Sequence, residues 1–172
     1  MWPAQNRDAA RFAGRYPGDE TECRFVSTFG LMKSCATRTA PRPGKPAARP
    51  WGMARTHRPG GWIYVHPERL GAFARWVLPR LDAPFTLLSG NHTTDIRPGP
   101  VPQAAFDRIL GHPHLVHWYA QNCAADHPKL SVLPLGLDYH TMSIGRVGFW
   151  GERADPVAQE AALDRIRRAT PP

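Results

Sequence analysis

Short apolar runs alternate with stretches of helical periodicity through the middle of the chain. Each run has the length and the β-branched or aromatic content of a strand, and turn-forming residues lie beside it. The four runs cover residues 62–66, 85–89, 115–119 and 130–135. An earlier apolar run, residues 23–35, is typical of a strand that enters a short helix.

Helical periodicity separates the first three of these runs, and the polar loop QNCAADHPK separates the last two. Over residues 68–81 apolar side chains recur every three or four positions, which predicts an amphipathic helix. Pro67 suits the first turn of that helix, and Pro79 is expected to interrupt or kink it. Two further helices are predicted: residues 103–110, ended by Gly111, and residues 156–169, capped by Asp155.

The alternation of strands and helices predicts an α/β fold. Such an order favours a mainly parallel sheet with helices on both faces, and 172 residues suffice for one compact domain. We expect a Rossmann-like three-layer domain over residues 23–150. A disordered N-terminus over residues 1–22 precedes it, and a C-terminal helix and linker over residues 151–172 follow it.

The net charge of +8 is concentrated in one segment. No acidic residue occurs from Ala36 to Pro67, whereas arginine and lysine recur there among prolines. A basic segment can attract polyanions, but this one has no interleaved aromatic residue for base stacking beyond Trp51. We therefore interpret residues 38–60 as a basic loop, most of it disordered, and expect no nucleic-acid partner.

Other features exclude several classes of protein. The chain has neither a long apolar stretch nor an apolar segment behind a basic start, so we expect no membrane span and no secretory signal. Its three cysteines, Cys23, Cys35 and Cys123, form no C-x-x-C pair and indicate neither a disulfide framework nor a zinc site. We expect a soluble, cytoplasmic protein with reduced thiols.

Polar and titratable residues directly follow three of the predicted strands. In chain order they are Asn91, His92 and Asp95, then Gln121 and Asn122, then Asp138, Tyr139 and His140. Because the carboxyl ends of parallel strands meet at one edge of a sheet, these side chains are expected to line one cleft.

Metal chemistry is an alternative interpretation of the same region. Ser89 to His92 resemble the G-N-H motif of calcineurin-like phosphoesterases, whose histidine serves a two-metal centre. In that family a D-x-H element precedes G-N-H, whereas here Asp138 and His140 follow it, and G-D-x-x-D is missing. The histidines at 112, 114 and 117 suit loop caps as well as ligands, so no metal ligand is assigned.

A set of motifs extends over residues 25–165: STFGLMKSC, WIYVH, PFTLLSGN, HWYAQN, HPKL, LPLGLDYHT and FWGERADPVAQEAAL. Together they resemble the N-terminal half of exostosin-like glycosyltransferases of bacteria, algae and large viruses. The resemblance implies the first domain of a GT-B enzyme, in which this half binds the acceptor and a second Rossmann-like domain binds a nucleotide sugar.

The donor-binding segment of that family, similar to C-H-R-T-W-E-A-L, does not occur in this chain. The resemblance therefore implies an acceptor-side half that holds no cofactor, is inactive alone, and is truncated or completed by a second chain with the donor domain. A saccharide or glycan acceptor is the expected partner. A saccharide-binding or phosphoesterase-like α/β module is the alternative.

Glycosyl transfer needs a base for the acceptor hydroxyl. From their placement after strands we assign this role to Asp95, Asp138 or His140. The residues expected to bind the saccharide are Asn91, His92, Gln121, Asn122 and Tyr139.

Overall fold

The computed structural model describes residues 26–38, 51–139 and 156–170. The chain divides into two compact units. Residues 35–135 form one unit, and the chain before residue 35 together with the chain after residue 135 forms the other. We call them the sheet unit and the terminal unit and describe each by itself.

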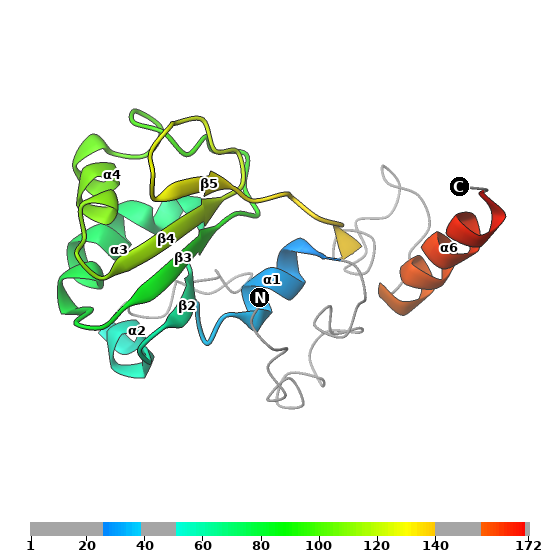
Figure 1. Ribbon diagram of the computed structural model, residues 1–172, viewed down its shortest axis with the longest axis horizontal. Helices are drawn as coiled ribbons and strands as arrows, with labels where there is room; N and C mark the ends of the chain where they lie inside the picture. Colours follow the sequence, from blue (N-terminus) through cyan, green and yellow to red (C-terminus); the bar gives the residue numbers. More distant parts are fainter. Residues whose placement is uncertain (1–25, 39–50, 140–155, 171–172) are drawn as a thin grey trace. The chain divides into compact units, whose positions relative to one another are not determined.

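The sheet unit contains a five-stranded, entirely parallel sheet, so the expected α/β class is confirmed (Figure 1). Its order is the order of the chain. The strands are β1 (Thr37–Arg38), β2 (Gly61–Tyr64), β3 (Phe85–Ser89), β4 (Leu115–Ala120) and β5 (Leu130–Val132). The architecture is consistent with a Rossmann-like fold, and the four predicted strands all form.

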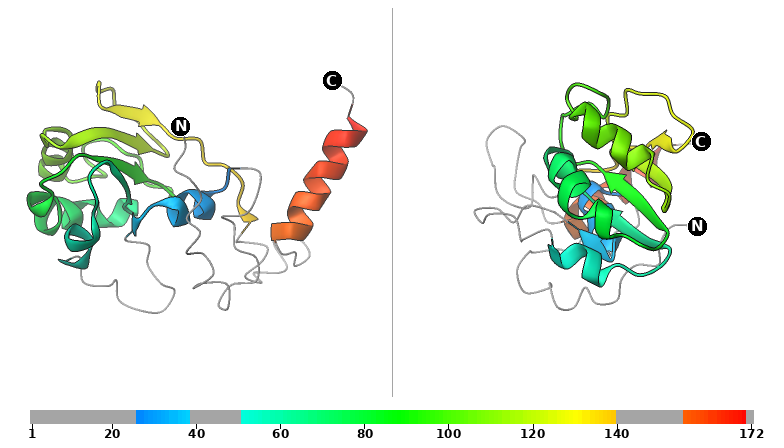
Figure 2. Two further views of the ribbon diagram at one scale, coloured as in Figure 1. Left: turned by 60° about the horizontal axis from the view of Figure 1, so that its bottom comes forward. Right: turned by 90° about the vertical axis from the view of Figure 1, so that its left-hand side faces the viewer.

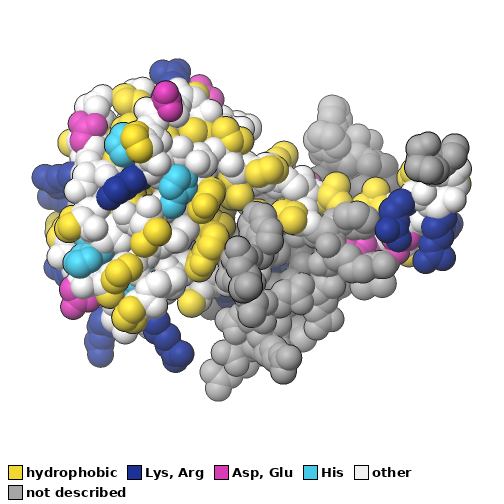
Figure 3. All heavy atoms as spheres, viewed as in Figure 1, with side chains coloured by type: hydrophobic (Ala, Val, Ile, Leu, Met, Phe, Trp, Pro, Cys, Tyr) yellow, Lys and Arg dark blue, Asp and Glu magenta, His cyan; other side chains and the backbone are white. Residues whose placement is uncertain are grey.

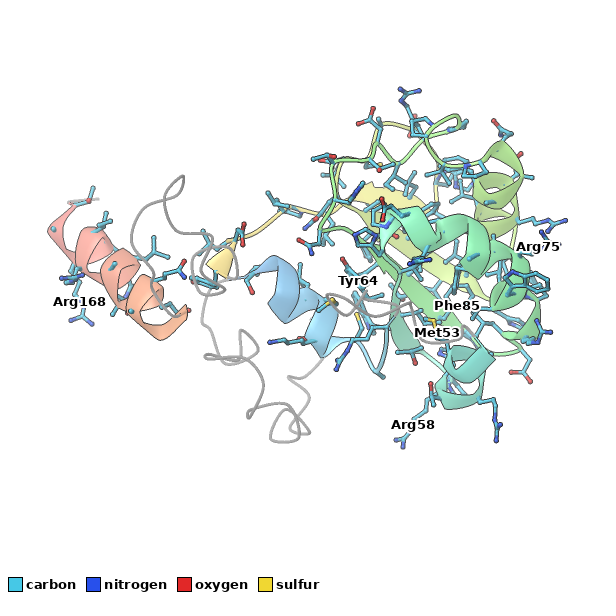
Figure 4. All side chains as sticks on the ribbon, turned by 180° about the vertical axis from the view of Figure 1, so that it is seen from behind. Met53, Arg58, Tyr64, Arg75, Phe85 and Arg168 are labelled. Carbon is cyan, nitrogen blue, oxygen red and sulfur yellow. The ribbon has the colours of Figure 1, made fainter. Side chains whose placement is uncertain are left out.

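Two helical connections pack on the same face of this sheet. The β2–β3 connection consists of the 3-10 turn η3 (Pro67–Arg69), helix α3 (Leu70–Trp76) and the 3-10 turn η4 (Leu78–Arg80). The β3–β4 connection contains α4 (Gln103–Leu110). When each right-handed crossover adds the next strand on the same side of the preceding one, the connecting helices lie on one face of the sheet. In agreement with this, α3 contacts α4. In Figure 1 α3 lies behind the strands, and in Figure 4, seen from behind, it lies in front.

The predicted helix boundaries are largely confirmed. Pro67 begins η3, and Pro79 lies in η4, so the expected long helix is broken at this proline. Gly111 caps α4 by donating its N–H to Asp107 O. Because proline lacks an N–H and fixes φ, it fits the start of a helical turn and interrupts one further along.

The hydrophobic core lies between the sheet and these helices. Side chains at the same register level of four strands form one layer of it: Ile63, Leu87, Trp118 and Leu130. Apolar residues at helical spacing on α3 and α4 cover that layer, including Phe73 and Phe106. The Trp118 ring lies 5.7 Å from that of Phe106, between centroids. Burial of this apolar layer is the main force that holds the sheet unit together.

The opposite face of the sheet is mixed in character. Alternate residues of the strands project from it, and the Trp62 and Tyr119 rings lie nearly parallel there, 6.0 Å apart between centroids. His117 shares a 2.8 Å hydrogen bond between its Nε2 and Oγ of Ser131. The space-filling view of this side shows hydrophobic side chains beside histidines (Figure 3).

Part of the basic loop is ordered. Residues 51–56 of the predicted disordered stretch form α2 (Trp51–Thr56), and Met53 is buried in the core. Figure 4 shows α2 and Met53 beside the sheet, with Phe85 nearby. The physical reason is that no proline lies between Pro50 and Pro59, and the residues between them can form a helical turn with an apolar side chain. Residues 39–50 lie outside the described residues, as do residues 1–25.

In the terminal unit the described residues include the helices α1 (Thr28–Ser34) and α6 (Pro156–Ala169) (Figure 2). The helix predicted from residue 156 is thus confirmed, while its expected cap, Asp155, lies outside the described residues. Ser27 pairs with Leu137 in an isolated parallel bridge. Gly136 has φ of 72°, and a Cβ there would lie 2.6 Å from Val26 O, so this turn requires glycine. No helix in the described ranges is long and apolar enough to cross a membrane.

Candidate functional site

The carboxyl ends of β2, β3 and β4 bring polar side chains together within the sheet unit. The chain after β2 stays extended through His66, because Val65 donates its N–H to Leu88 O at 2.8 Å. Pro67 then starts η3 and places Glu68 in its first turn. His92 belongs to the loop that follows β3. These three residues form the centre of the candidate site.

Glu68 lies between two imidazoles. Its Oε1 is 3.4 Å from Nε2 of His92, and its Oε2 is 3.8 Å from Nδ1 of His66. The two rings meet edge to face with centroids 5.0 Å apart. The Glu68 side chain is 62% exposed, whereas the His66 side chain is 8% exposed. The carboxylate therefore faces solvent, and the two imidazoles lie on its protein side.

The hydrogen bonds of His92 define its neutral tautomer. Its Nδ1 receives the backbone N–H of Thr94 at 3.2 Å and lies 2.6 Å from Thr94 Oγ1. A backbone N–H can only donate, so Nδ1 is an acceptor and the ring proton of neutral His92 is assigned to Nε2. Nε2 is the nitrogen that lies 3.4 Å from Glu68 Oε1, so the ring proton is on the side of the carboxylate.

Burial lowers the pKa of His66. The neighbouring His92 lowers this pKa further, while Glu68 and a backbone hydrogen bond with Asn91 raise it; Arg69 makes a smaller lowering contribution. Desolvation dominates because an imidazolium loses hydration when it is buried. His66 is therefore biased toward the neutral form, which leaves Glu68 without a full cation on that side.

Gln121 and Asn122, which directly follow β4, hold the loop after β3. Gln121 accepts the Asn91 N–H at Oε1, 2.5 Å away. Asn122 donates from Nδ2 to His92 O at 2.7 Å. Two of the predicted clusters, after β3 and after β4, are thus adjacent, as expected from parallel strands.

Two asparagines adopt the left-handed backbone conformation in these loops. The φ angles are 59° for Asn91 and 51° for Asn122. Asparagine enters this region more readily than most residues, because its short polar side chain makes local hydrogen bonds. These turns redirect the chain directly after β3 and β4.

The other predicted site residues lie elsewhere. Asp95 forms an ion pair with Arg97, at 3.3 Å between Oδ2 and Nε, and both side chains are about half exposed. Asp138 and Tyr139 belong to the terminal unit. Tyr139 is 1% exposed, its hydroxyl lies 3.5 Å from Glu160 Oε1, and its carbonyl accepts a hydrogen bond from Gln159. His140 is outside the described residues.

Sequence reasoning missed His66 and Glu68. His66 was counted as the last residue of the first apolar run, and Glu68 as the start of a helix. The rule that selected Asn91 and Gln121, a polar residue directly after a strand, applies equally to His66, since β2 ends at Tyr64. If the first predicted strand had ended at Tyr64 and not at His66, the same rule would have selected His66 together with the residues after β3 and β4.

The described residues contain no group of three or more histidine, cysteine, aspartate or glutamate side chains arranged to hold a metal ion. His112 and His114 precede β4 and are neighbours, whereas His117 lies within β4 and has a different partner. The His112 and His114 rings lie 5.8 Å apart, whereas His117 bonds to Ser131. Burial lowers the pKa of His112, with His114 as the next cause, and burial also lowers the pKa of His117.

No protein-family model, curated protein or solved structure matches this chain. The candidate site therefore rests on the geometry of the sheet unit.

Proposed function

We propose that this chain is the acceptor-binding half of a glycosyltransferase and that the acceptor saccharide binds at the carboxyl ends of β2, β3 and β4. The observation that carries the proposal is the exposed Glu68 carboxylate held against two imidazoles. The resemblance of the sequence motifs to exostosin-like transferases supplies the class of ligand.

In this proposal Glu68 binds the hydroxyl that receives the sugar. A carboxylate accepts a hydrogen bond from a hydroxyl and can take its proton as the oxygen attacks. His92 Nε2, 3.4 Å from one carboxylate oxygen, helps to hold the carboxylate in place for the ligand. Burial biases His66 to the neutral form, so no full positive charge lies on that side of the carboxylate.

The sheet unit supplies only the acceptor side of the reaction. Transfer also requires stabilisation of the negative charge that develops on a departing nucleoside diphosphate. We assign that task to a donor domain with its nucleotide sugar, on a second chain or a further segment. The isolated chain is then expected to bind saccharide weakly and to show no turnover.

Calorimetric titration of the purified chain with methyl glycosides of glucose, galactose, xylose and N-acetylglucosamine tests the proposal. We expect millimolar binding of at least one glycoside, loss of it in Glu68→Gln, and retention in the control Asp82→Asn. Asp82 is exposed and precedes β3, at the other edge of the sheet. Equal binding by wild-type protein and Glu68→Gln would overturn the proposal.

The same preparation tests the phosphoesterase alternative. Elemental analysis and hydrolysis of p-nitrophenyl phosphate with added Mn²⁺ are the measurements. Stoichiometric metal with hydrolysis that His92→Gln abolishes would replace a saccharide site by a metal centre.

A further inference from the structure

Gln121 lies at the centre of the loops that form the candidate site. It is 3% exposed, although its amide is a strongly polar group. Its Oε1 accepts the N–H of Asn91, in the loop after β3, at 2.5 Å. Its Nε2 donates to Leu135 O, in the segment after β5, at 3.0 Å. The side chain of one residue directly after β4 thus hydrogen-bonds the backbone after β3 and the backbone after β5, the strands on either side of β4.

Gly90 makes room for this amide. A Cβ at Gly90 would lie 2.5 Å from Gln121 Cδ and closer still to its Oε1. The Gly90 carbonyl accepts the hydroxyl of Tyr64 at 2.6 Å. The backbone directly before Asn91 is thus fixed from β2 and from β4 at once.

We propose that Gln121 is the positioning residue of the site: its buried amide fixes the loop after β3 and thereby places His92 beside Glu68. Asn91 connects the two, because it donates its N–H to the amide oxygen of Gln121 and directly precedes His92. Its backbone has the left-handed conformation. Asn122 adds a second tie at His92 O. The inference rests on the proposed function only for its ligand; the geometry it predicts is independent of any ligand.

An amide is required because the two backbone partners differ in kind. Asn91 N–H needs an acceptor, and Leu135 O needs a donor. A carboxylate offers only acceptors, whereas a protonated carboxylic acid offers one of each. Gln121→Glu should therefore reproduce the native loop when the new carboxyl group is protonated and lose it when the group ionises.

The experiment follows the ¹⁵N resonances of the His92 ring in the full chain. In wild-type protein the signals should show the Nε2–H tautomer with Nδ1 as acceptor. Near pH 7, Gln121→Met, of similar length but without an amide, and Gln121→Glu should both lose this signature. Near pH 4.5, close to the ordinary pKa of a glutamate and below that of a buried one, the backbone amide shifts of residues 91–94 in Gln121→Glu should return to those of wild-type protein, whereas those in Gln121→Met should not.

The comparison is made against wild-type protein at each pH, and Gln103→Glu is the matched control. Gln103 is exposed on α4 and donates to Asp107 Oδ1, so its replacement should leave the His92 signals unchanged. Unaltered His92 signals in folded Gln121→Met, with a lower melting temperature only, would overturn the proposal. Unaltered signals in Gln121→Glu at neutral pH would do so as well.

Glycoside titration of the same variants separates this inference from the proposed function. Binding to wild-type protein that weakens at least tenfold in Gln121→Met and recovers at low pH in Gln121→Glu supports both. If wild-type protein binds no glycoside but its His92 signals depend on Gln121 as predicted, the positioning role stands and the saccharide ligand is rejected.

Discussion

Gly90→Ala is predicted to destabilise the sheet unit by about 2 kcal/mol, through a single steric conflict. The added Cβ would lie 2.5 Å from Gln121 Cδ. Gly90 is not among the residues with positive φ, so alanine strains no backbone dihedral there. The size of the effect depends on whether the Gln121 amide can move away.

Two hydrogen bonds hold that amide in place. Movement would remove the acceptor of Asn91 N–H and the donor to Leu135 O, and each such loss in a buried region costs about 1–3 kcal/mol. Overpacking without movement costs a similar amount. Both displacement of the amide and overpacking are therefore unfavourable, and we expect the free energy of unfolding to fall by about 2 kcal/mol.

A double-mutant cycle isolates the conflict. Gln121→Ala alone should cost about 3 kcal/mol from lost packing and hydrogen bonding. In Gly90→Ala/Gln121→Ala the new methyl group meets no amide, so the double variant should cost about 3 kcal/mol instead of the additive 5 kcal/mol. The coupling energy is then about 2 kcal/mol.

Urea unfolding followed by tryptophan fluorescence measures these values. Gly71→Ala is the matched control, because a Cβ at Gly71 meets only Pro102 Cγ at 3.7 Å and alanine favours α3. The control should be neutral or stabilising by up to about 1 kcal/mol. Additive losses in the double variant, or a Gly90→Ala chain as stable as wild type, would refute the reasoning.

Three further predictions concern pH, a buried hydrogen bond and the core. Burial lowers the pKa of His66, His112 and His117. Below about pH 6.5 the unfolded chain therefore binds protons at these histidines that the folded chain does not bind. The free energy of unfolding should fall as the pH is lowered below about 6.5, and above that pH it should not depend on these groups. Melting temperatures at about pH 7.5 and pH 5 check this, and a flat profile would contradict it. Trp118→Phe removes the 3.1 Å bond from Nε1 to Ser89 Oγ and should cost about 1–3 kcal/mol in urea unfolding, so a loss near zero would show that the bond contributes little. Leu87→Ala should lower the free energy of unfolding by about 2–5 kcal/mol in the same assay. Val132→Ala, at a 67% exposed position on the edge strand, should change it by less than about 0.5 kcal/mol. Equal losses for the two variants would show that Leu87 is not part of the core.

The sheet unit was predictable where the signal is local. The run at 85–89 is mostly apolar, has no charged residue, and forms a strand whose residues are all buried, as a central parallel strand requires. The helix signal over 68–81 and its proline break are also local, since Pro79 acts through its own ring. The helix α2 was missed because arginine and proline counts averaged over residues 38–60 concealed a short segment without proline.

The site was predictable only in part. Strand ends after β3 and β4 were found because parallel strands carry polar residues at one edge. The sequence cannot show which partner a polar side chain takes: Asp95 pairs with Arg97, and the amide of Gln121 bonds backbone groups on neighbouring loops. The partners of Gln121 are set by tertiary distances, which a one-dimensional pattern does not contain, whereas the Asp95–Arg97 pair spans only two residues of the sequence.

The most direct test of the central claim is an amide chemical-shift map of the ¹⁵N-labelled full chain titrated with the four methyl glycosides. The account predicts that one glycoside shifts residues 66–69, 91–94 and 121–122 together, and that Glu68→Gln removes these shifts while Asp82→Asn keeps them. Shifts confined to other parts of the chain, or none at high millimolar glycoside, would contradict a saccharide site at the carboxyl ends of β2, β3 and β4.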